Sequence, residues 1–118
     1  MRNSSVRNSS VRNSSERKAR RHYRLRAYRI LGENVWIAGY ELDLVVRRGR
    51  SLVFCEVKSK TGTRYGDPEE MVTPEKQRRL RLAAQAWLAR HPEHAHCRVQ
   101  FDVVTERAGK LRRLASAF

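Results

Sequence analysis

The sequence predicts a mixed α/β fold in which helices flank a central sheet. Two apolar runs, Glu41–Val46 and Ser51–Ser59, are separated by a short glycine-containing turn and have the composition of paired strands. A helix with a clear start follows at Thr73, and another apolar strand follows that helix over Val99–Thr105. Strands that both precede and follow a helix are typical of layered α/β domains.

The first fifteen residues are predicted to form a disordered tail. Residues 2–16 consist of three pentads that each begin Arg-Asn-Ser-Ser, and two valines are their only apolar side chains. Such a segment cannot bury enough surface to offset the entropy of ordering it. We therefore expect one domain over residues 16–118, which is long enough for a single hydrophobic core.

Two elements are predicted before the apolar hairpin. Glu16–Leu31 is expected to be a helix, with the Ser15 hydroxyl as its cap and Glu16 favourably placed in the first turn. Asn34–Ala38 has the composition of a short strand that leads into the hairpin. Trp36, within that strand, is expected in the core.

The second helix has a strong start signal. Thr73 can cap it, Pro74 suits its first position, and Glu75 lies at the positive end of its dipole. An apolar stripe then recurs at helical spacing as far as Arg90. The stripe consists of Leu80, Ala83, Ala84, Trp87 and Leu88. Residues 59–72 before it are predicted to be a loop that can contact a ligand, and a last short strand is expected over Lys110–Leu114.

The hairpin determines which side chains share a face. With Arg48 and Gly49 as a two-residue loop, Asp43 lies opposite Phe54 and Glu41 lies opposite Glu56. The first face then consists of Glu41, Asp43, Val45, Leu52, Phe54, Glu56 and Lys58, and the second consists of Leu42, Leu44, Val46, Val53, Cys55 and Val57. Both faces are expected to be covered, as in the centre of a sheet with helices on both sides. A bulge in the turn would separate these faces.

Charged residues interrupt the apolar strands at Asp43, Glu56 and Lys58. Charges in such a setting are costly unless they pair or bind a metal ion. Mg²⁺ held by one or two carboxylates keeps positions open for water and phosphate. A neighbouring lysine can orient or deprotonate the water and pair with the phosphate. The pattern indicates a divalent-metal site suited to phosphodiester cleavage. A surface salt bridge between Lys58 and either acid is the alternative.

The charge of the chain favours a polyanionic partner. The formal net charge is +14, and residues 1–30 contain ten Arg or Lys but one Glu. A field of this size attracts nucleic acid. A membrane surface is the rival partner, but the first helix has few large apolar side chains to insert. The expected nucleic-acid-binding residues are Arg17, Lys18, Arg20, Arg21, Arg24, Lys60, Arg78 and Arg79.

Other features limit the choice of function. No apolar stretch approaches the roughly 20 residues that cross a bilayer, so we expect a soluble protein. Cys55 and Cys97 suggest core thiols in a reducing, cytoplasmic setting. His91–Cys97 contains three histidines and a cysteine, but a polar loop is a simpler interpretation than a zinc site. Asp102 interrupts an apolar strand and is expected to be a buried acid paired with an arginine.

Two motifs resemble those of the YraN-like family of small bacterial proteins. They are Glu-Leu-Asp-Leu-Val over 41–45 and Leu-Val-Phe-Cys-Glu-Val-Lys-Ser-Lys over 52–60. Further matches are Tyr28–Leu31, Asn34, Tyr65-Gly66, Val72, Lys76 and Phe101–Val104, so the resemblance extends from about Glu16 to Val104. Tyr40 stands where the family usually has glycine, and Cys55 replaces a branched residue, but neither change removes a ligand.

The resemblance implies a restriction-endonuclease-like fold and metal-dependent nuclease chemistry. Asp43 and Glu56 would be the metal ligands, and Lys58 would be the catalytic lysine. Four residues are candidates for supporting roles. Glu16 would lend a carboxylate or simply start its helix; Glu41 would face the metal or end its strand; Lys76 would lie over the site or in solvent; Gln77 is a further candidate.

These observations favour a Mg²⁺- or Mn²⁺-dependent endonuclease that acts on DNA, including structured or branched DNA. A nucleic-acid-binding protein that keeps the fold without turnover is the first alternative. An assembly protein that docks on an acidic partner is another. By analogy with enzymes of this fold, a homodimer is a further hypothesis.

Overall fold

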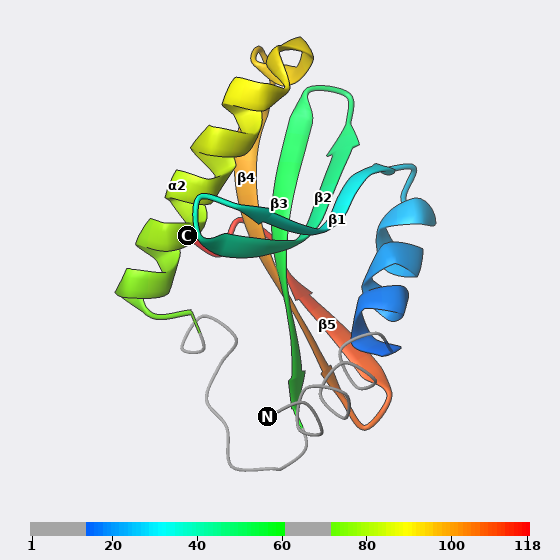
Figure 1. The fold of residues 1–118 in the computed structure, drawn as a ribbon. Coiled ribbons are helices and arrows are strands. Elements are labelled where there is room, and N and C mark those ends of the chain that lie inside the picture. Colours follow the sequence, from blue (N-terminus) through cyan, green and yellow to red (C-terminus); the bar gives the residue numbers. More distant parts are fainter. Residues whose placement is uncertain (1–13, 61–71) are drawn as a thin grey trace.

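The structure, a computed structural model, describes residues 14–60 and 72–118 and has a five-stranded mixed sheet with helices on either side (Figure 1). The described elements are an N-terminal helix (residues 14–24), β1 (Arg29–Ile37), β2 (Tyr40–Arg48), β3 (Ser51–Lys60), α2 (Pro74–Arg90), the short 3-10 helix η2 (Pro92–His94), β4 (Arg98–Arg107) and β5 (Lys110–Leu114). The strand order is β1-β2-β3-β4-β5. Only β3 and β4 pair in parallel, with α2 in the connection between them. This architecture confirms the predicted mixed α/β class and is compatible with a restriction-endonuclease-like fold.

Each face of the sheet packs against its own core. On one face, Phe54 and its neighbours contact α2, and the rings of Phe54 and Trp87 meet edge to face with centroids 5.7 Å apart. On the other face, Tyr23 and Ala19 of the N-terminal helix cover Val53 and its neighbours. Strand alternation sends successive side chains into these two cores, as expected for a sheet covered on both sides.

Over the residues that pair, Leu44–Arg48 with Ser51–Cys55, the hairpin of β2 and β3 has the predicted faces but a different register. Leu44 pairs with Cys55, and Arg48 with Ser51, so the two-residue turn is Gly49–Arg50 rather than Arg48–Gly49. Gly49 has a φ of 60°, a conformation that glycine adopts easily at the first turn position. The shift of two residues preserves the faces, because side chains alternate with a period of two. It also removes Asp43 from its predicted position opposite Phe54, which pairs with Val45 instead.

The first part of β2, before Leu44, does not pair with β3. It pairs only with β1, and together these two segments cross the α2 side of the sheet (Figure 1). This coiling packs Leu42 into the α2-side core, not into the opposite face as predicted. Tyr40 packs against the same core, so the residue between them, Glu41, turns away and pairs with Trp36. Trp36 is 69% exposed, and its predicted core position is therefore wrong. Trp87 occupies the core as predicted.

The N-terminal helix is shorter at its C-terminal end than predicted. Its helical residues end at 24 instead of Leu31, because Ala27 has a φ of 69°. The backbone N–H of Tyr28 then donates to the Tyr23 carbonyl (3.0 Å), and that of Ala27 donates to the Arg24 carbonyl (3.0 Å), a Schellman C-cap. The rings of Tyr23 and Tyr28 pack edge to face at 5.1 Å. The chain thus enters β1 at Arg29, five residues before the predicted strand.

At the other end, the helix includes Ser14 and Ser15, which the repeat pattern places in the tail. Ser15 is buried within the helix and donates a hydrogen bond to Glu106 (2.6 Å). It therefore anchors the helix to β4 and is not the cap of the helix. The rest of the predicted tail, residues 1–13, lies outside the described residues. So do residues 61–71 of the predicted loop.

The remaining elements agree with the sequence. Thr73 caps α2 by accepting a hydrogen bond from the Lys76 backbone N–H (3.2 Å), and α2 ends at Arg90. β4 and β5 form where strands were predicted. Among the described residues, no helix is long and apolar enough to cross a membrane.

Candidate active site

The predicted catalytic residues lie near the point where β2 and β3 separate. The ladder between these strands ends at Leu44 and Cys55. Past the end of the ladder, the backbone N–H of Val57, two residues after Cys55, donates to Oδ2 of Asp43, the residue before Leu44, at 2.9 Å. The Asp43 carboxylate therefore takes the place of a backbone acceptor and holds the branch point of the two strands. Glu56 and Lys58 extend from β3 on the same face as Phe54, the face that α2 covers.

Glu56 is the centre of the cluster. Its side chain is 9% exposed, and its Oε2 lies 3.2 Å from Lys58 Nζ, whose side chain is 22% exposed. Tyr40 donates its hydroxyl proton to Glu56 Oε1 at 3.3 Å. Both carboxylate oxygens therefore have partners, which offsets the cost of burying a charge. Lys58 is thus more open to solvent than the carboxylate with which it pairs.

The pKa of the Tyr40 hydroxyl depends on the charged residues around the site. Burial raises the pKa of the Tyr40 hydroxyl well above its ordinary value, and the charges of Glu56 and Asp43 raise it further. The Arg79 guanidinium on α2 opposes this effect. Tyr40 thus stays a proton donor to Glu56 at all physiological pH values. Tyr40 was not predicted as a site residue, because it stood out only as a departure from the family glycine. The feature that could have indicated it is an aromatic hydroxyl directly before the Glu-x-Asp motif.

The predicted supporting residues are dispersed. Glu16 is buried on the N-terminal helix, which covers the other face of the sheet. Glu41 lies beside Trp36 and does not share the face of Glu56 as predicted. Lys76 is exposed on the first turn of α2, and the Gln77 side chain donates to the Val72 carbonyl at 3.0 Å. None of these placements tests a role in catalysis.

The predicted nucleic-acid-binding residues separate into two groups. Arg78 and Arg79 are exposed on α2, on the same side of the sheet as Glu56, and both pair with Glu75. The others lie on the N-terminal helix across the sheet, except Lys60, whose side chain is outside the described residues. Of that helical group, Arg17, Arg21 and Arg24 are exposed, Lys18 pairs with Glu106, and Arg20 pairs with Glu33.

The site offers hard oxygen ligands. Asp43 and Glu56 contribute two carboxylates, and no cluster of three or more His, Cys, Asp or Glu side chains able to hold a metal ion occurs within residues 14–60 and 72–118. In the histidine-rich loop, His91 Nδ1 contacts the Trp87 carbonyl (2.8 Å) and His94 Nδ1 contacts Arg47 (2.6 Å). Two carboxylates with open positions fit Mg²⁺ or Mn²⁺ better than Zn²⁺.

A sequence model of the uncharacterised protein family UPF0102 matches residues 15–105, which include Asp43, Glu56 and Lys58. The chain belongs to the UPF0102 family. This is the YraN-like family whose motifs the hairpin carries. No activity is part of the UPF0102 description.

Individual UPF0102 proteins are similar over the same region. The protein from Frankia casuarinae is 58% identical over 64 residues, 54% of this chain and 53% of its own length. The protein from Frankia alni is 56% identical over 64 residues, 54% of this chain and 52% of its own length. The protein from Mycolicibacterium vanbaalenii is 47% identical over 84 residues, 70% and 68% of the two chains. The match thus spans about half the length of each Frankia protein.

Proposed function

We propose that this UPF0102 protein is a Mg²⁺- or Mn²⁺-dependent endonuclease that cleaves DNA. The proposal rests on the ion pair of Glu56 with Lys58 and on the Asp43 carboxylate, which accepts a hydrogen bond from the backbone N–H of Val57, the residue between them. Hydrolysis of a phosphodiester needs an activated water and stabilisation of negative charge on the phosphate. Two carboxylates and an amine that act on one phosphate are suited to both requirements.

The chain's own residues would prepare the site before any substrate arrives. Asp43 and Glu56 would hold the metal ion, which when bound supplies an acidified water and neutralises phosphate charge. The Val57 N–H fixes the Asp43 carboxylate, and the Tyr40 hydroxyl fixes that of Glu56. Such partners hold ligands in the geometry that binding requires. The Lys58 ammonium would orient the attacking water or donate to a phosphate oxygen.

DNA is the proposed substrate because of charge and position. The chain carries a net charge of +14. Arg78 and Arg79 lie on the same side of the sheet as Glu56, where they can bind the phosphates that flank a scissile bond. We propose a homodimer as the form that cuts both strands, by analogy with enzymes of this fold class.

A cleavage assay on supercoiled, linear, nicked and branched DNA tests the proposal. Cleavage should require Mg²⁺ or Mn²⁺ and stop with a chelator. Glu56→Gln and Lys58→Ala should each lower the rate by at least about 100-fold. Glu75→Gln is the matched control, because it makes the same chemical change at an exposed residue of α2; it releases Arg78 and Arg79 from their ion pairs and should not lower the rate of cleavage.

Metal binding provides an independent readout. Calorimetric titration with Mg²⁺ should give binding to the wild type and to Glu75→Gln, but not to Glu56→Gln. Equal cleavage by Glu56→Gln and Glu75→Gln would exclude the proposed site. Salt-sensitive DNA binding that no chelator alters, without cleavage of any form of DNA, would instead identify a non-catalytic binding protein.

A further inference from the structure

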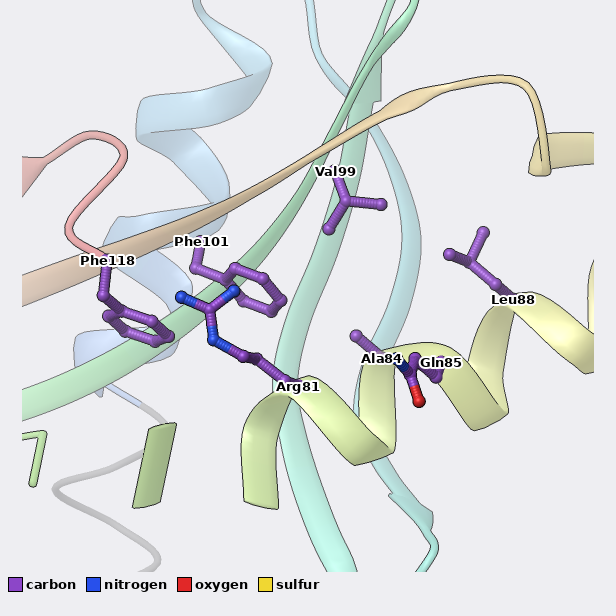
Figure 2. A pocket seen from close by; sticks show the side chains of 7 residues that line it. All are labelled: Arg81, Ala84, Gln85, Leu88, Val99, Phe101 and Phe118. Carbon is purple, nitrogen blue, oxygen red and sulfur yellow. The ribbon is translucent and has the colours of Figure 1, made fainter. Parts of the chain in front are cut away.

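A pocket of about 320 Å³ lies between α2 and the first half of β4 (Figure 2). Its apolar lining includes Leu88, Val99, Phe101 and Phe118. Arg81 and Gln85 of α2 contribute its polar groups. Apolar walls with a few placed polar groups are typical of sites for small ring systems.

The pocket exists because β4 is only half covered along one edge. β5 pairs with β4 from Val103 onwards, so the residues before it have a strand neighbour only in β3. The chain after β5 crosses this edge, where the Ala117 N–H donates to the Phe101 carbonyl at 2.7 Å. It places the Phe118 ring parallel to Phe101, with centroids 5.2 Å apart. Val99, at the mouth, remains 40% exposed.

The pocket and the candidate active site are neighbours on one face. In the β3–β4 register, Phe54 pairs with Phe101, and Glu56 pairs with Val103. Phe101 is therefore one strand across and two residues along from Glu56, about 8 Å from it by strand geometry. α2 contributes to both the candidate site and the pocket. The charge of Arg79 lowers the pKa of the Tyr40 hydroxyl, and Arg81 lines the pocket. A polymer bound at Glu56 can thus reach the pocket with an adjacent unit.

Arg81 gives the pocket a flat cationic surface. Its guanidinium lies 5.1 Å from the Phe101 ring centroid and 5.3 Å from that of Phe118, and Figure 2 shows it beside both rings. This contact holds the guanidinium in place. Nucleobases stack on guanidinium planes and on aromatic rings, and the Gln85 amide can both donate to and accept from a base edge.

We propose that this pocket receives an unpaired base of the nucleic-acid strand that is bound at the active site. The inference rests on the proposed function and makes its substrate more specific. A base within a duplex is stacked on both sides, so it can enter a lateral pocket only after it has left the stack. The preferred substrate is therefore a strand with unpaired bases, either single-stranded or at a branch.

Binding measured without metal tests the proposal separately from cleavage. The probes are a labelled oligothymidylate, an abasic strand of the same length, and a duplex of that length, all in chelator. The wild type should bind oligothymidylate about 5- to 150-fold more tightly than the abasic strand, the range expected for one stacked base. Arg81→Ala should abolish this ratio. Arg78→Ala, which removes the same charge from an exposed position of α2, should weaken all three complexes and keep the ratio.

A second variant leaves the arginine in place. Val99→Glu puts a carboxylate at the exposed mouth of the pocket and should also abolish the preference for bases, while the thermal transition shows that the protein is folded. Equal wild-type affinity for oligothymidylate and the abasic strand would overturn the proposal. A second outcome would also overturn it: Val99→Glu keeps the preference for bases but no longer associates with other copies of the chain. The pocket would then be an interface between copies. A base preference without any cleavage would support the pocket and contradict the nuclease.

Discussion

At the scale of single residues, two buried acids differ in what surrounds them. Asp102 is fully buried and accepts hydrogen bonds from Tyr23, Arg113, Gln100 and the Ser116 backbone, at 2.7 to 2.9 Å. This confirms the expected buried acid paired with an arginine. Glu56 instead has one hydroxyl and one lysine, and that lysine reaches the surface. Asp102 is saturated by buried structural partners, whereas Glu56 has fewer partners and one of them, Lys58, is partly exposed.

Replacement of Asp102 should therefore test stability and not function. Every neighbour of its carboxylate is a donor, so the amide NH₂ of Asp102→Asn would face donors and leave Arg113 without a countercharge. We expect a loss of about 3–5 kcal/mol in the free energy of unfolding. Urea denaturation measures it. The exposed Glu75→Gln, which loses two surface ion pairs at the start of α2, should change the same quantity by only about 1 kcal/mol, and similar losses for both variants would contradict this account.

The lowered pKa values of two histidines, His22 and His94, should make the stability of the protein depend on pH. Burial lowers the pKa of His22 below its ordinary value of 6.5, and the charges of Arg26 and Arg113 lower it further. Burial also lowers the pKa of His94. Because the unfolded chain takes up these protons first, stability should be greatest above pH 6.5 and should fall as the pH drops through the lowered values.

The variant His22→Phe isolates one of these contributions. Phenylalanine keeps a ring beside Tyr23, which His22 contacts edge to face at 5.3 Å, but it cannot take up a proton. Thermal unfolding between pH 7.5 and 5 should therefore show a smaller decrease for this variant than for the wild type. Identical decreases would show that His22 does not contribute.

At the scale of elements, side-chain alternation was predictable but chain reversals were not. The faces of the β2–β3 hairpin followed from the period of two, which holds in any register of the same parity. The register itself depended on whether Arg48 or Arg50 shared the turn with Gly49, and both are arginines. Trp36 was misplaced because β2 separates from β3 and coils with β1, a long-range effect that no local pattern records. The proximity of Asp43 to the Glu56–Lys58 segment was predictable from the pairing of the two strands, and it is seen in the bond from the Val57 N–H to Asp43.

The end of the N-terminal helix offers an element-scale prediction. Ala27 has a φ of 69°, which costs an L-residue with a Cβ more than it costs glycine. Ala27→Gly should therefore stabilise the protein by about 0.5–1 kcal/mol in urea denaturation. Ala89→Gly is the matched control, since Ala89 is exposed within α2 and should lose a similar amount. Destabilisation by both substitutions would contradict the role of the left-handed residue.

At the scale of the whole molecule, the sheet divides the basic residues between two sides. The sequence showed a strongly basic N-terminal region but could not show that its helix packs on the face opposite Glu56 and Lys58. The arginines of α2 lie on the same side as the candidate site. Charge that is adjacent in sequence is thus separated in space, and only one of the two groups can contact a duplex that is bound at the site.

This separation predicts different salt dependences for two sets of variants. Arg78→Ala with Arg79→Ala should lower the slope of log affinity against log salt by about 0.9 for each phosphate that the variant no longer neutralises, measured on catalytically inactive Glu56→Gln protein with duplex DNA. Arg17→Ala with Arg21→Ala removes the same charge from exposed positions of the N-terminal helix. It should leave the slope nearly unchanged, because a duplex bound on the α2 side does not reach those residues. Equal reductions would mean that DNA is bound by overall charge and not by the face that carries Asp43, Glu56 and Lys58.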